Sequence, residues 1–160
     1  MMQRDFEAKV VALTQTLYRV SAALLARLCD RQDAVQSSIL LAWQNRHRVR
    51  DERAFRPWIV RILINECYAI HRKNRRIVLT DAPDTPETAE DMLAVHLRDQ
   101  VLHEAVQGLP EKHRITVVLH YMEGASVREI SSILRVPAGT VKSRLNTARG
   151  MLRDALREEA

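Results

Sequence analysis

Apolar residues recur at steps of three and four along most of this 160-residue chain, and this period constrains the fold more than any other feature. The first run begins at Phe6 and continues as a single apolar face to Leu28. Such spacing places the apolar side chains on one face of an α-helix. Gly is scarce, with four residues, and aromatic residues make up only 4%, a composition that favours helices over strands. The sequence therefore predicts an all-α fold.

The same period predicts further helices before the C-terminal segment, over residues 31–45, 57–76, 89–109 and 110–122. Asp5 is expected to cap the first helix, and Pro57 suits the first turn of the third. Residues 46–56 are almost wholly polar or charged, so we expect a loop there.

A change of composition divides the chain. Residues 79–88 are rich in Asp, Pro and Thr and have no apolar period, which is typical of a linker. Between Asp81 and Asp99 there are six acidic residues against one basic residue. We therefore expect two small helical domains, residues 1–77 and 96–160, joined by a flexible acidic linker over residues 78–95.

Two basic blocks flank this acidic segment. Ten Lys and Arg face three acidic residues between Arg46 and Arg76, and six face one acidic residue between Arg135 and Arg157. The whole chain has a formal net charge of +5 and a pI near 9.7. This distribution favours a polyanionic partner, although solvated helix faces would give a similar pattern in either block alone.

A pair of helices near the C-terminus has the most specific local pattern. Ser126 and Glu129 form an S-x-x-E capping box, which starts a helix at Val127. Pro137 lacks an amide donor, so that helix is expected to end in a short turn over Arg135–Gly139. The helix after the turn directs one apolar face inward, formed by Val141, Leu145, Ala148 and Leu152. The segment is predicted to be a helix-turn-helix.

The outer face of that second helix suits DNA. It carries short polar donors and cations, as a helix that enters the major groove requires, and no acidic residue occurs from Thr140 to Arg153. Two helices packed in a bundle would instead present Glu–Lys pairs. The candidates for the groove are Thr140, Lys142, Ser143, Arg144 and Asn146. The candidates for phosphate contact, which positions a protein without reading sequence, are Arg135, Arg149 and Arg153.

Other classes of protein receive little support. The N-terminus lacks a leader pattern and no apolar run approaches the roughly 20 residues of a membrane span, so we expect a cytoplasmic protein without membrane insertion. Cys29 and Cys67 are expected to be buried free thiols. The histidines lack the i, i+4 spacing of a metal-binding helix, and no nucleophile–base pattern accompanies them. No catalytic residue, metal or cofactor is expected, and the chain is not expected to be an enzyme.

The helix-turn-helix resembles a known family. The pattern P-x-G-T-V-K-S-R-L-x-x-A-R over residues 137–149 is similar to region four of sigma-70 family factors, and more narrowly to the extracytoplasmic-function (ECF) group. The preceding Leu109-Pro110 and Tyr121-Met122-Glu123-Gly124 also fit that group.

The N-terminal half resembles the same family independently. Asp33-Ala-Val-Gln36 followed by Ala42-Trp43 is similar to the polymerase-binding helix of region two. Phe55-x-x-Trp58-Ile-x-x-Ile62-x-x-Asn65, with its basic tail, is similar to the promoter-melting segment. Ser37 stands where the family usually has Glu, and Ala69 where Asp is common. The resemblance covers residues 5–77 and 96–158.

The resemblance implies a factor that binds RNA polymerase core and directs promoter-specific transcription initiation. Region two would dock on the beta-prime clamp helices through Asp33, Gln36, Ser37 and Leu40, and region four would meet the beta flap and the −35 element. The loop Arg48–Phe55 and Asn65 would form a pocket for a base flipped from the non-template strand. The implied −10 and melting residues are Arg50, Arg53, Arg61, Asn65, His71, Arg72 and Lys73. The family also implies an anti-sigma factor, and the acidic linker suggests a DNA-mimicking role near the polymerase active centre.

A stand-alone helix-turn-helix regulator is the alternative. It would need a dimer interface and an effector domain, and the N-terminal half shows neither a heptad seam nor a ligand fingerprint. Such a regulator would retard promoter duplex strongly by itself, whereas a sigma factor would depend on core polymerase.

Overall fold

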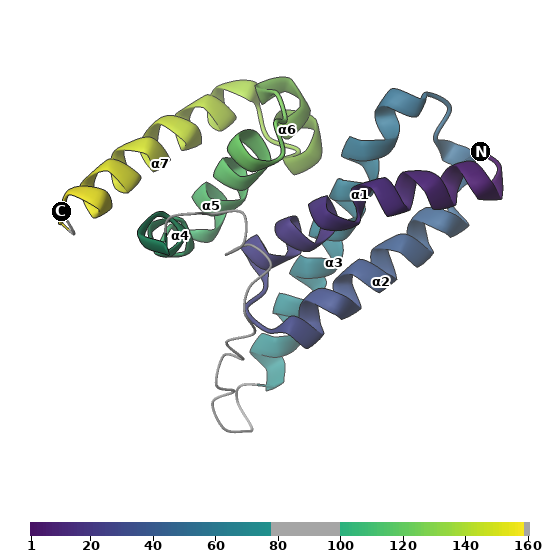
Figure 1. Cartoon of the computed structure of the whole chain (residues 1–160), viewed down its shortest axis with the longest axis horizontal. Coiled ribbons are helices and arrows are strands. Elements are labelled where there is room, and N and C mark those ends of the chain that lie inside the picture. The colour runs from purple at the N-terminus through teal and green to yellow at the C-terminus, as the bar shows by residue number, and fades with distance from the viewer. Residues whose placement is uncertain (78–99, 159–160) are drawn as a thin grey trace. The chain divides into compact units, whose positions relative to one another are not determined.

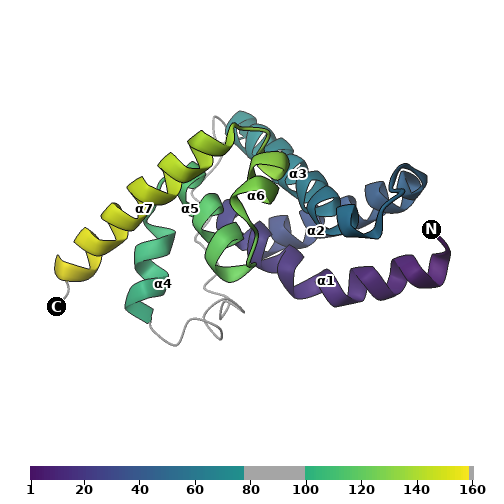
Figure 2. The same cartoon turned by 90° about the horizontal axis from the view of Figure 1, so that it is seen from above.

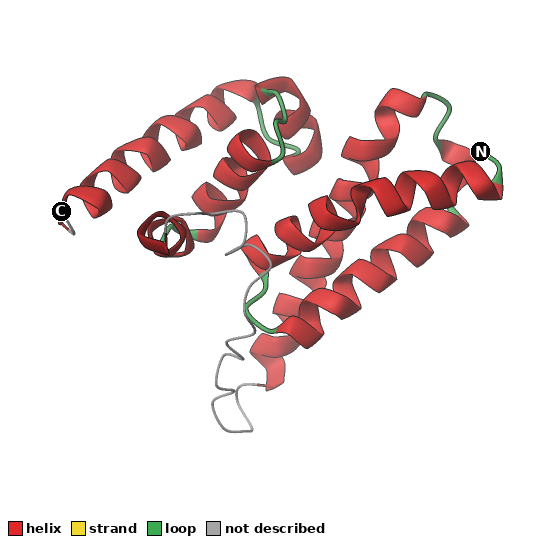
Figure 3. Ribbon diagram, viewed as in Figure 1, coloured by secondary structure: helices red, strands yellow, loops and turns green. Residues whose placement is uncertain are grey.

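The computed structural model describes residues 1–77 and 100–158. All the regular elements in these ranges are helical, as the red ribbons of Figure 3 show. The chain divides into two compact units, residues 1–88 and 89–160. The predicted all-α fold with two helical units is confirmed. The predicted linker over residues 78–95, its acidic side chains and the predicted helix start at Ala89 lie outside the described residues.

The first unit is a bundle of three long helices. It comprises α1 (Gln3–Leu24), α2 (Leu28–Gln44) and α3 (Phe55–Ile77). Each of the three packs against the other two (Figure 1, Figure 2).

Small side chains on α2 allow this close packing. Ala34, Ser38 and Ala42 recur at four-residue spacing on α2 and are fully buried. The Ser38 hydroxyl donates to the carbonyl of Val35 at 2.8 Å, so its burial leaves no donor unpaired. Larger buried side chains fill the remaining space, with Leu17 and Val20 from α1 and Ile59, Leu63 and Cys67 from α3.

The break between the first two helices differs from the prediction. The apolar period continues to Leu28, but α1 ends at Leu24 and Leu28 already begins α2. Leu25 and Arg27 have extended backbone conformations, and the Arg31 Nε donates to the Leu25 carbonyl at 2.8 Å across this connection. The apolar spacing continues across the break because the next helix begins within four residues. The spacing alone therefore could not show that one helix ends and another begins here.

Two smaller predictions are wrong. Met2, not Asp5, is the N-cap of α1, and Asp5 lies in the first turn, where its charge still favours the positive end of the helix dipole. Cys29 is exposed, because it is the second residue of α2 and faces away from the bundle, whereas Cys67 is buried as predicted.

An aromatic cluster holds the connection between α2 and α3. The predicted loop contains two short 3₁₀ turns, η1 (Arg46–Arg48) and η2 (Glu52–Ala54), and Phe55 already begins α3. Phe6 packs edge-on against Trp43 at 5.2 Å and against Phe55 at 5.8 Å between ring centroids. The Arg46 guanidinium lies 3.7 Å from the centroid of the Trp43 ring and donates to the Trp43 carbonyl. Aromatic pairs such as Phe6–Trp43 and Phe6–Phe55 contribute about 0.5–1.5 kcal/mol each beyond area burial.

The second unit contains α4 (Gln100–Gln107), α5 (Glu111–Val117), η3 (Val118–Met122), α6 (Val127–Leu134) and α7 (Ala138–Glu158). α7 packs against each of the other three α-helices. The fully buried core includes Ile115, Leu119, Ile130, Val141 and Leu145.

Arg114 stabilises the turn between α4 and α5. Its Nη1 donates to the carbonyls of Gln107 at 3.0 Å and Leu109 at 3.1 Å. Burial lowers the pKa of Arg114, and the nearby charge of Glu111 acts in the opposite direction. The guanidinium thus serves as a structural donor to the last carbonyl of α4 and to a carbonyl of the turn that follows it.

The helix predicted to run to Met122 ends in a π-helical turn. In η3 the Glu123 N–H donates to the Val118 carbonyl at 3.1 Å, five residues back. Gly124 follows with φ +67°, a left-handed conformation that costs glycine little. Single π turns are rare and are frequently found at functional sites.

The capping bond of α6 leads to a stability prediction. The Ser126 Oγ accepts from the Glu129 N–H at 3.1 Å, as the S-x-x-E pattern predicted. Ser126→Ala should lower the free energy of unfolding of the second unit by about 1 kcal/mol, because a helix N–H loses its acceptor. Amide hydrogen exchange of α6 and α7 in the full chain measures this.

The matched control is Ser143→Ala, at an exposed position inside α7. That change should stay within about 0.5 kcal/mol, since no cap is lost. Equal loss of protection in the two variants would show that the Ser126 bond is not what starts α6.

Candidate nucleic-acid interface

The turn between α6 and α7 is shorter than predicted. Arg135 ends α6 in the left-handed conformation, with φ 55°, and its N–H donates to the Ser131 carbonyl. The Ser131 hydroxyl donates to the Val136 carbonyl at 2.6 Å and ties the turn to α6. The Pro137 carbonyl accepts from the N–H groups of Thr140 and Val141 at 3.0 and 3.2 Å.

Ala138 and Gly139 are therefore helical rather than part of the turn. Pro137 ends α6 as predicted, but α7 starts directly after it. A proline at this position needs to supply only its carbonyl, so its missing N–H costs nothing.

The buried face of α7 is the one that the sequence predicted. Val141, Leu145 and Ala148 are buried and Leu152 is partly buried. The predicted DNA-binding side chains all lie on the remaining surface. Lys142, Ser143, Asn146, Arg149 and Arg153 are exposed, as is Arg135 in the turn, and Thr140 and Arg144 are half-buried.

The outer residues of α7 form three groups around the helix axis. With about 100° between successive residues, Ser143 lies opposite the buried face, and Asn146 lies near Ser143. Lys142, Arg149 and Arg153 follow one edge of the outer face, and Arg144 lies on the other edge. Short polar side chains thus occupy the centre and long cations occupy both edges. A helix in the major groove needs this arrangement, because base edges lie ahead of it and phosphates lie on both sides.

A pocket in the first unit contains the predicted Asn65. Its volume is about 230 Å³ and it lies where α2, η1 and the first half of α3 meet, lined by Leu41, Asn45, Arg48, Trp58, Ile62, Asn65 and Glu66. Asn65 lies inside α3 and its side chain is exposed, so the amide is not buried in the core. Trp58 is half-buried and forms part of the pocket wall.

The basic side chains of the first unit are not all gathered at this pocket. Arg61 and Arg72 lie four residues before and seven after Asn65, so the three share one face of α3. His71 lies about 120° round the helix from Asn65 and is half-buried, so it belongs to another side. The other predicted cations are exposed, namely Arg50 and Arg53 in the preceding loop and Lys73 on α3.

The basic end of α3 is anchored to α2. The Asn74 Nδ2 donates to the Asp30 Oδ2 at 3.1 Å, across 44 residues of sequence. This bond fixes the direction in which the cations around Arg72 leave the bundle.

One exposed face of α2 carries the four predicted polymerase-binding residues. Asp33, Gln36, Ser37 and Leu40 are all exposed, and Leu40 has 57% of its surface accessible. Beside them lies an apolar groove of about 400 Å³, lined by Gln3, Phe6, Glu7, Gln36, Ile39, Leu40 and Trp43. The α1 wall of this groove was not predicted, because it arises only where the first turns of α1 meet the second half of α2.

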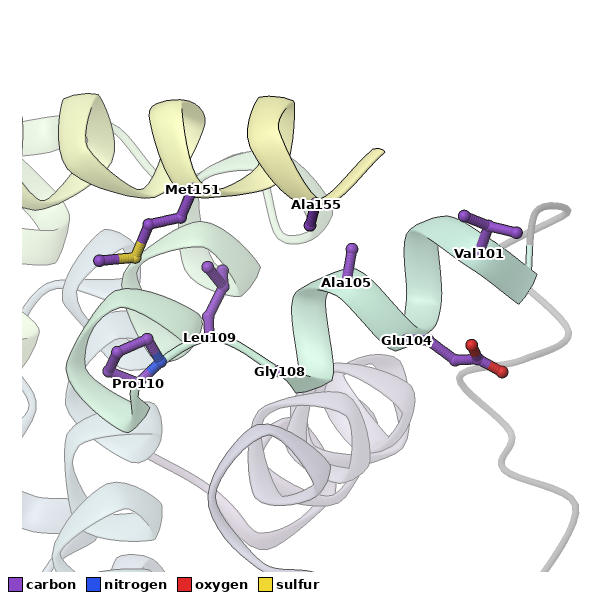
Figure 4. A pocket seen from close by; sticks show the side chains of 8 residues that line it. All are labelled: Val101, Glu104, Ala105, Gly108, Leu109, Pro110, Met151 and Ala155. Carbon is purple, nitrogen blue, oxygen red and sulfur yellow. The ribbon is translucent and has the colours of Figure 1, made fainter. Parts of the chain in front are cut away.

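A second apolar groove lies between α4 and the C-terminal half of α7. It has a volume of about 380 Å³, and Figure 4 shows its eight lining side chains on the two helices and the turn between α4 and α5. Val101 and Met151 line it and are 36% and 38% exposed, high values for large apolar side chains. This groove was not predicted from the sequence, since its two walls are 40 or more residues apart along the chain.

The described part of the chain offers neither a membrane span nor a metal cluster. None of its helices is both long and apolar enough to cross a bilayer. Within residues 1–77 and 100–158, no three His, Cys, Asp or Glu side chains gather as a metal ion would require.

Comparisons with known proteins match both units. Residues 10–77 match the family model "Sigma-70 region 2", and residues 99–152 match "Sigma-70, region 4". The chain is 30% identical to the RNA polymerase sigma factor SigV of Bacillus subtilis, over 91% of this chain and 87% of that protein. It is 33% identical to the ECF RNA polymerase sigma factor SigL of Mycobacterium tuberculosis, over 94% and 93%.

A solved structure has the same fold. The sigma factor RpoE, in a co-crystal structure with the anti-sigma factor NepR from Bartonella quintana, aligns with a TM-score of 0.78 at 23% identity. The alignment covers 96% of this chain and 98% of that one.

The left-handed Arg135 leads to a second prediction. A side chain at positive φ costs roughly 1–2 kcal/mol, which glycine avoids. Arg135→Gly should therefore raise the free energy of unfolding of the second unit by about 1 kcal/mol, although it removes an exposed cation. Hydrogen exchange of α6 and α7 amides measures the gain.

Arg128→Gly is the matched control, because Arg128 is an exposed cation with helical backbone inside α6. That change should lower stability by about 1 kcal/mol. A loss of stability in both variants would contradict the strain assigned to Arg135.

Proposed function

Because this chain belongs to the ECF group of the sigma-70 family of RNA polymerase sigma factors, we propose that its two units read separate promoter elements for the core enzyme. The observation that carries this division is the placement of two distinct polar surfaces. One is the outer face of α7, and the other is the Asn65 pocket with the basic face of α3. The proposed domains are residues 1–77 and 96–160, with residues 78–95 as the connection.

In the second unit, α7 reads the −35 element. Ser143 and Asn146, at the centre of the outer face, meet base edges in the major groove. Lys142 and Arg149 on one edge and Arg144 on the other meet the phosphates that border the groove. Phosphate contacts set the register of the helix, and the short central side chains let the helix approach the bases closely.

In the first unit, the pocket at Asn65 accepts one base of the melted −10 element. A base that leaves the duplex stack costs a few kcal/mol, so the protein must replace its contacts. The Asn65 amide can both donate to and accept from a base edge, and Trp58 supplies an aromatic wall. Arg50, Arg53, Arg61, Arg72 and Lys73 hold the adjoining phosphates, and His71 would approach DNA from a different side of α3.

The core enzyme binds the apolar surfaces of the two units. Asp33, Gln36, Ser37 and Leu40 dock on the beta-prime clamp helices, with Leu40 as the central apolar contact. The groove around Val101 and Met151 receives an apolar segment of the beta flap. The factor itself catalyses no reaction, and it acts in the cytoplasm, where the polymerase works.

An anti-sigma factor is a further proposed partner. The structural neighbour RpoE is bound to the anti-sigma factor NepR. This chain offers two apolar grooves of comparable size, one in each unit. A protein that covered them would block the core enzyme by occupying the surfaces that it needs.

Core binding and promoter recognition should be separable. Lys142→Ala and Arg144→Ala should each weaken transcription from every promoter of a library by roughly 10- to 100-fold, since each removes one phosphate contact of about 1.5–3 kcal/mol, and should leave core affinity unchanged. Asp33→Ala and Leu40→Ala should do the reverse and weaken core binding first. Run-off transcription with core polymerase on a promoter library, together with core-binding titrations, measures both effects.

The absence of any core-dependent transcript from the unaltered chain would overturn the proposed function. Loss of core binding in the Lys142 or Arg144 variant would contradict the division of roles. Strong retardation of promoter duplex by the chain alone would favour a stand-alone regulator.

The pocket at Asn65 predicts a position-specific effect. Asn65→Ala should abolish discrimination at one position of the non-template strand, where the unaltered protein prefers one base by roughly 5- to 100-fold. Base-by-base substitution in the −10 region, read by open-complex formation, locates that position.

Asn74→Ala is the control. It removes a side-chain amide from the same helix, but this amide donates to Asp30 and does not line the pocket. It should reduce stability and leave base discrimination intact. If the Asn65→Ala variant kept the same base preference at every position of the −10 region, the pocket would not be the site that recognises the base.

A further inference from the structure

Tyr121 is an exposed aromatic residue that none of the proposed contacts uses. It lies in the π-helical turn η3, and 55% of its surface is accessible. Its hydroxyl oxygen accepts a hydrogen bond from the Arg149 Nε on α7, 28 residues further along the chain. The Arg149 guanidinium also lies 5.8 Å from the centroid of the Tyr121 ring, within the range of a cation–π contact.

The π turn fixes the place of this tyrosine. The Glu123 N–H bonds to Val118 and the Ala125 N–H bonds to the Leu119 carbonyl at 2.9 Å, so the backbone on the C-terminal side of Tyr121 is held. His120 adds a second restraint, because its Nδ1 lies 2.9 Å from the Ala125 carbonyl oxygen and its ring packs edge-on against Tyr121 at 4.8 Å. Tyr121 therefore stands on a rigid support, although it is at the surface.

The hydrogen bond leaves donors available on both partners. The Tyr121 hydroxyl accepts from Arg149, so its own hydrogen can point to a third group. Arg149 uses its Nε, and the structure gives its two terminal amino groups no partner among the described residues. The two terminal amino groups of Arg149 and the hydroxyl of Tyr121 can thus all donate to one small acceptor that carries several oxygens.

We propose that Tyr121 and Arg149 together form a binding site for a single DNA backbone phosphate, in which Tyr121 positions the guanidinium and donates one hydrogen bond itself. The site rests on the proposed DNA-binding function of α7. Arg149 lies on the same edge of the outer face as Lys142, where the phosphates beside the major groove are expected. The non-bridging oxygens of a phosphate match the planar fork of an arginine.

Positioning is the physical gain from the tyrosine. An exposed arginine loses rotamer freedom when it binds, which weakens its contact. Arg149 is already held through its Nε by a neighbour on a rigid turn, so less of that freedom remains to be lost. The sequence predicted a phosphate contact at Arg149, but no local pattern pairs this residue with Tyr121, 28 residues earlier.

The test uses the full chain and a fluorescein-labelled duplex of mixed sequence, since phosphate contacts do not depend on sequence. Fluorescence anisotropy gives the affinity at several salt concentrations. Arg149→Gln should weaken binding and reduce the salt slope by about 1. Tyr121→Phe, which keeps the ring and the net charge, should weaken binding about fivefold, as expected for one hydrogen bond.

Coupling between the two changes decides the proposal. Tyr121→Phe should have a clearly smaller effect in an Arg149→Gln background, because only the tyrosine's own hydrogen bond to the phosphate is then left to lose. In an Arg157→Gln background it should keep its full effect, because Arg157 is an exposed cation eight residues further along α7, away from Tyr121. Thermal unfolding of Tyr121→Phe should match that of the unaltered chain.

Additive effects of Tyr121→Phe and Arg149→Gln would overturn the site, as would unchanged affinity in Tyr121→Phe. A large loss of thermal stability in that variant would make Tyr121 a structural residue instead. The unaltered chain should bind the duplex weakly, and measurably only at low salt, as non-specific phosphate contacts do; no binding there would also overturn the site. Core-dependent transcription by the unaltered chain is measured in parallel. A transcript without the expected coupling would overturn only the phosphate site, whereas no transcript would overturn the proposed function itself.

Discussion

Burial of one apolar stripe on each helix determines what that helix can present to a partner. A buried Leu such as Leu145 contributes about 1.5–3 kcal/mol, more than most exposed polar contacts, so the core sets the rotation of the helix. In α7 that rotation places Ser143 outward and cations on both edges. In α2 the buried Ala34–Ala42 row has the same effect for the face that carries Leu40. Each of the two proposed interfaces is therefore the exposed face of a helix whose opposite face is buried in a core.

Local contacts then refine surfaces that the cores have set. In the first unit, the aromatic cluster around Phe6 and Phe55 holds the connection between α2 and α3, and this connection supplies Arg48 to the Asn65 pocket. In the second unit, the π turn supplies Tyr121 to Arg149. In both places a rigid irregular segment, rather than a regular helix, completes the site. Irregular backbone is well suited to this role, because it can direct a side chain that helical geometry would turn elsewhere.

Much of the candidate site was predictable. The outer face of α7 follows from the apolar period alone, since a stripe at Val141, Leu145 and Ala148 leaves only one arrangement for Ser143 and its neighbours. The start of α6 follows from Ser126, whose side chain bonds within its own helix turn. The failures were of a different kind. Cys29 and Leu28 were misplaced because a three-residue break between two helices does not disturb the apolar period.

The sequence by itself determined the helical class, the helix-turn-helix and the residues that face outward from α7, because these depend on residues three or four apart in one helix. Only the tertiary structure decided the two apolar grooves, which helices form the walls of the pocket at Asn65, and the pairing of Tyr121 with Arg149. Each of these requires side chains from different helices to meet. Their distances depend on how the helices pack, and no local period in the sequence encodes that packing.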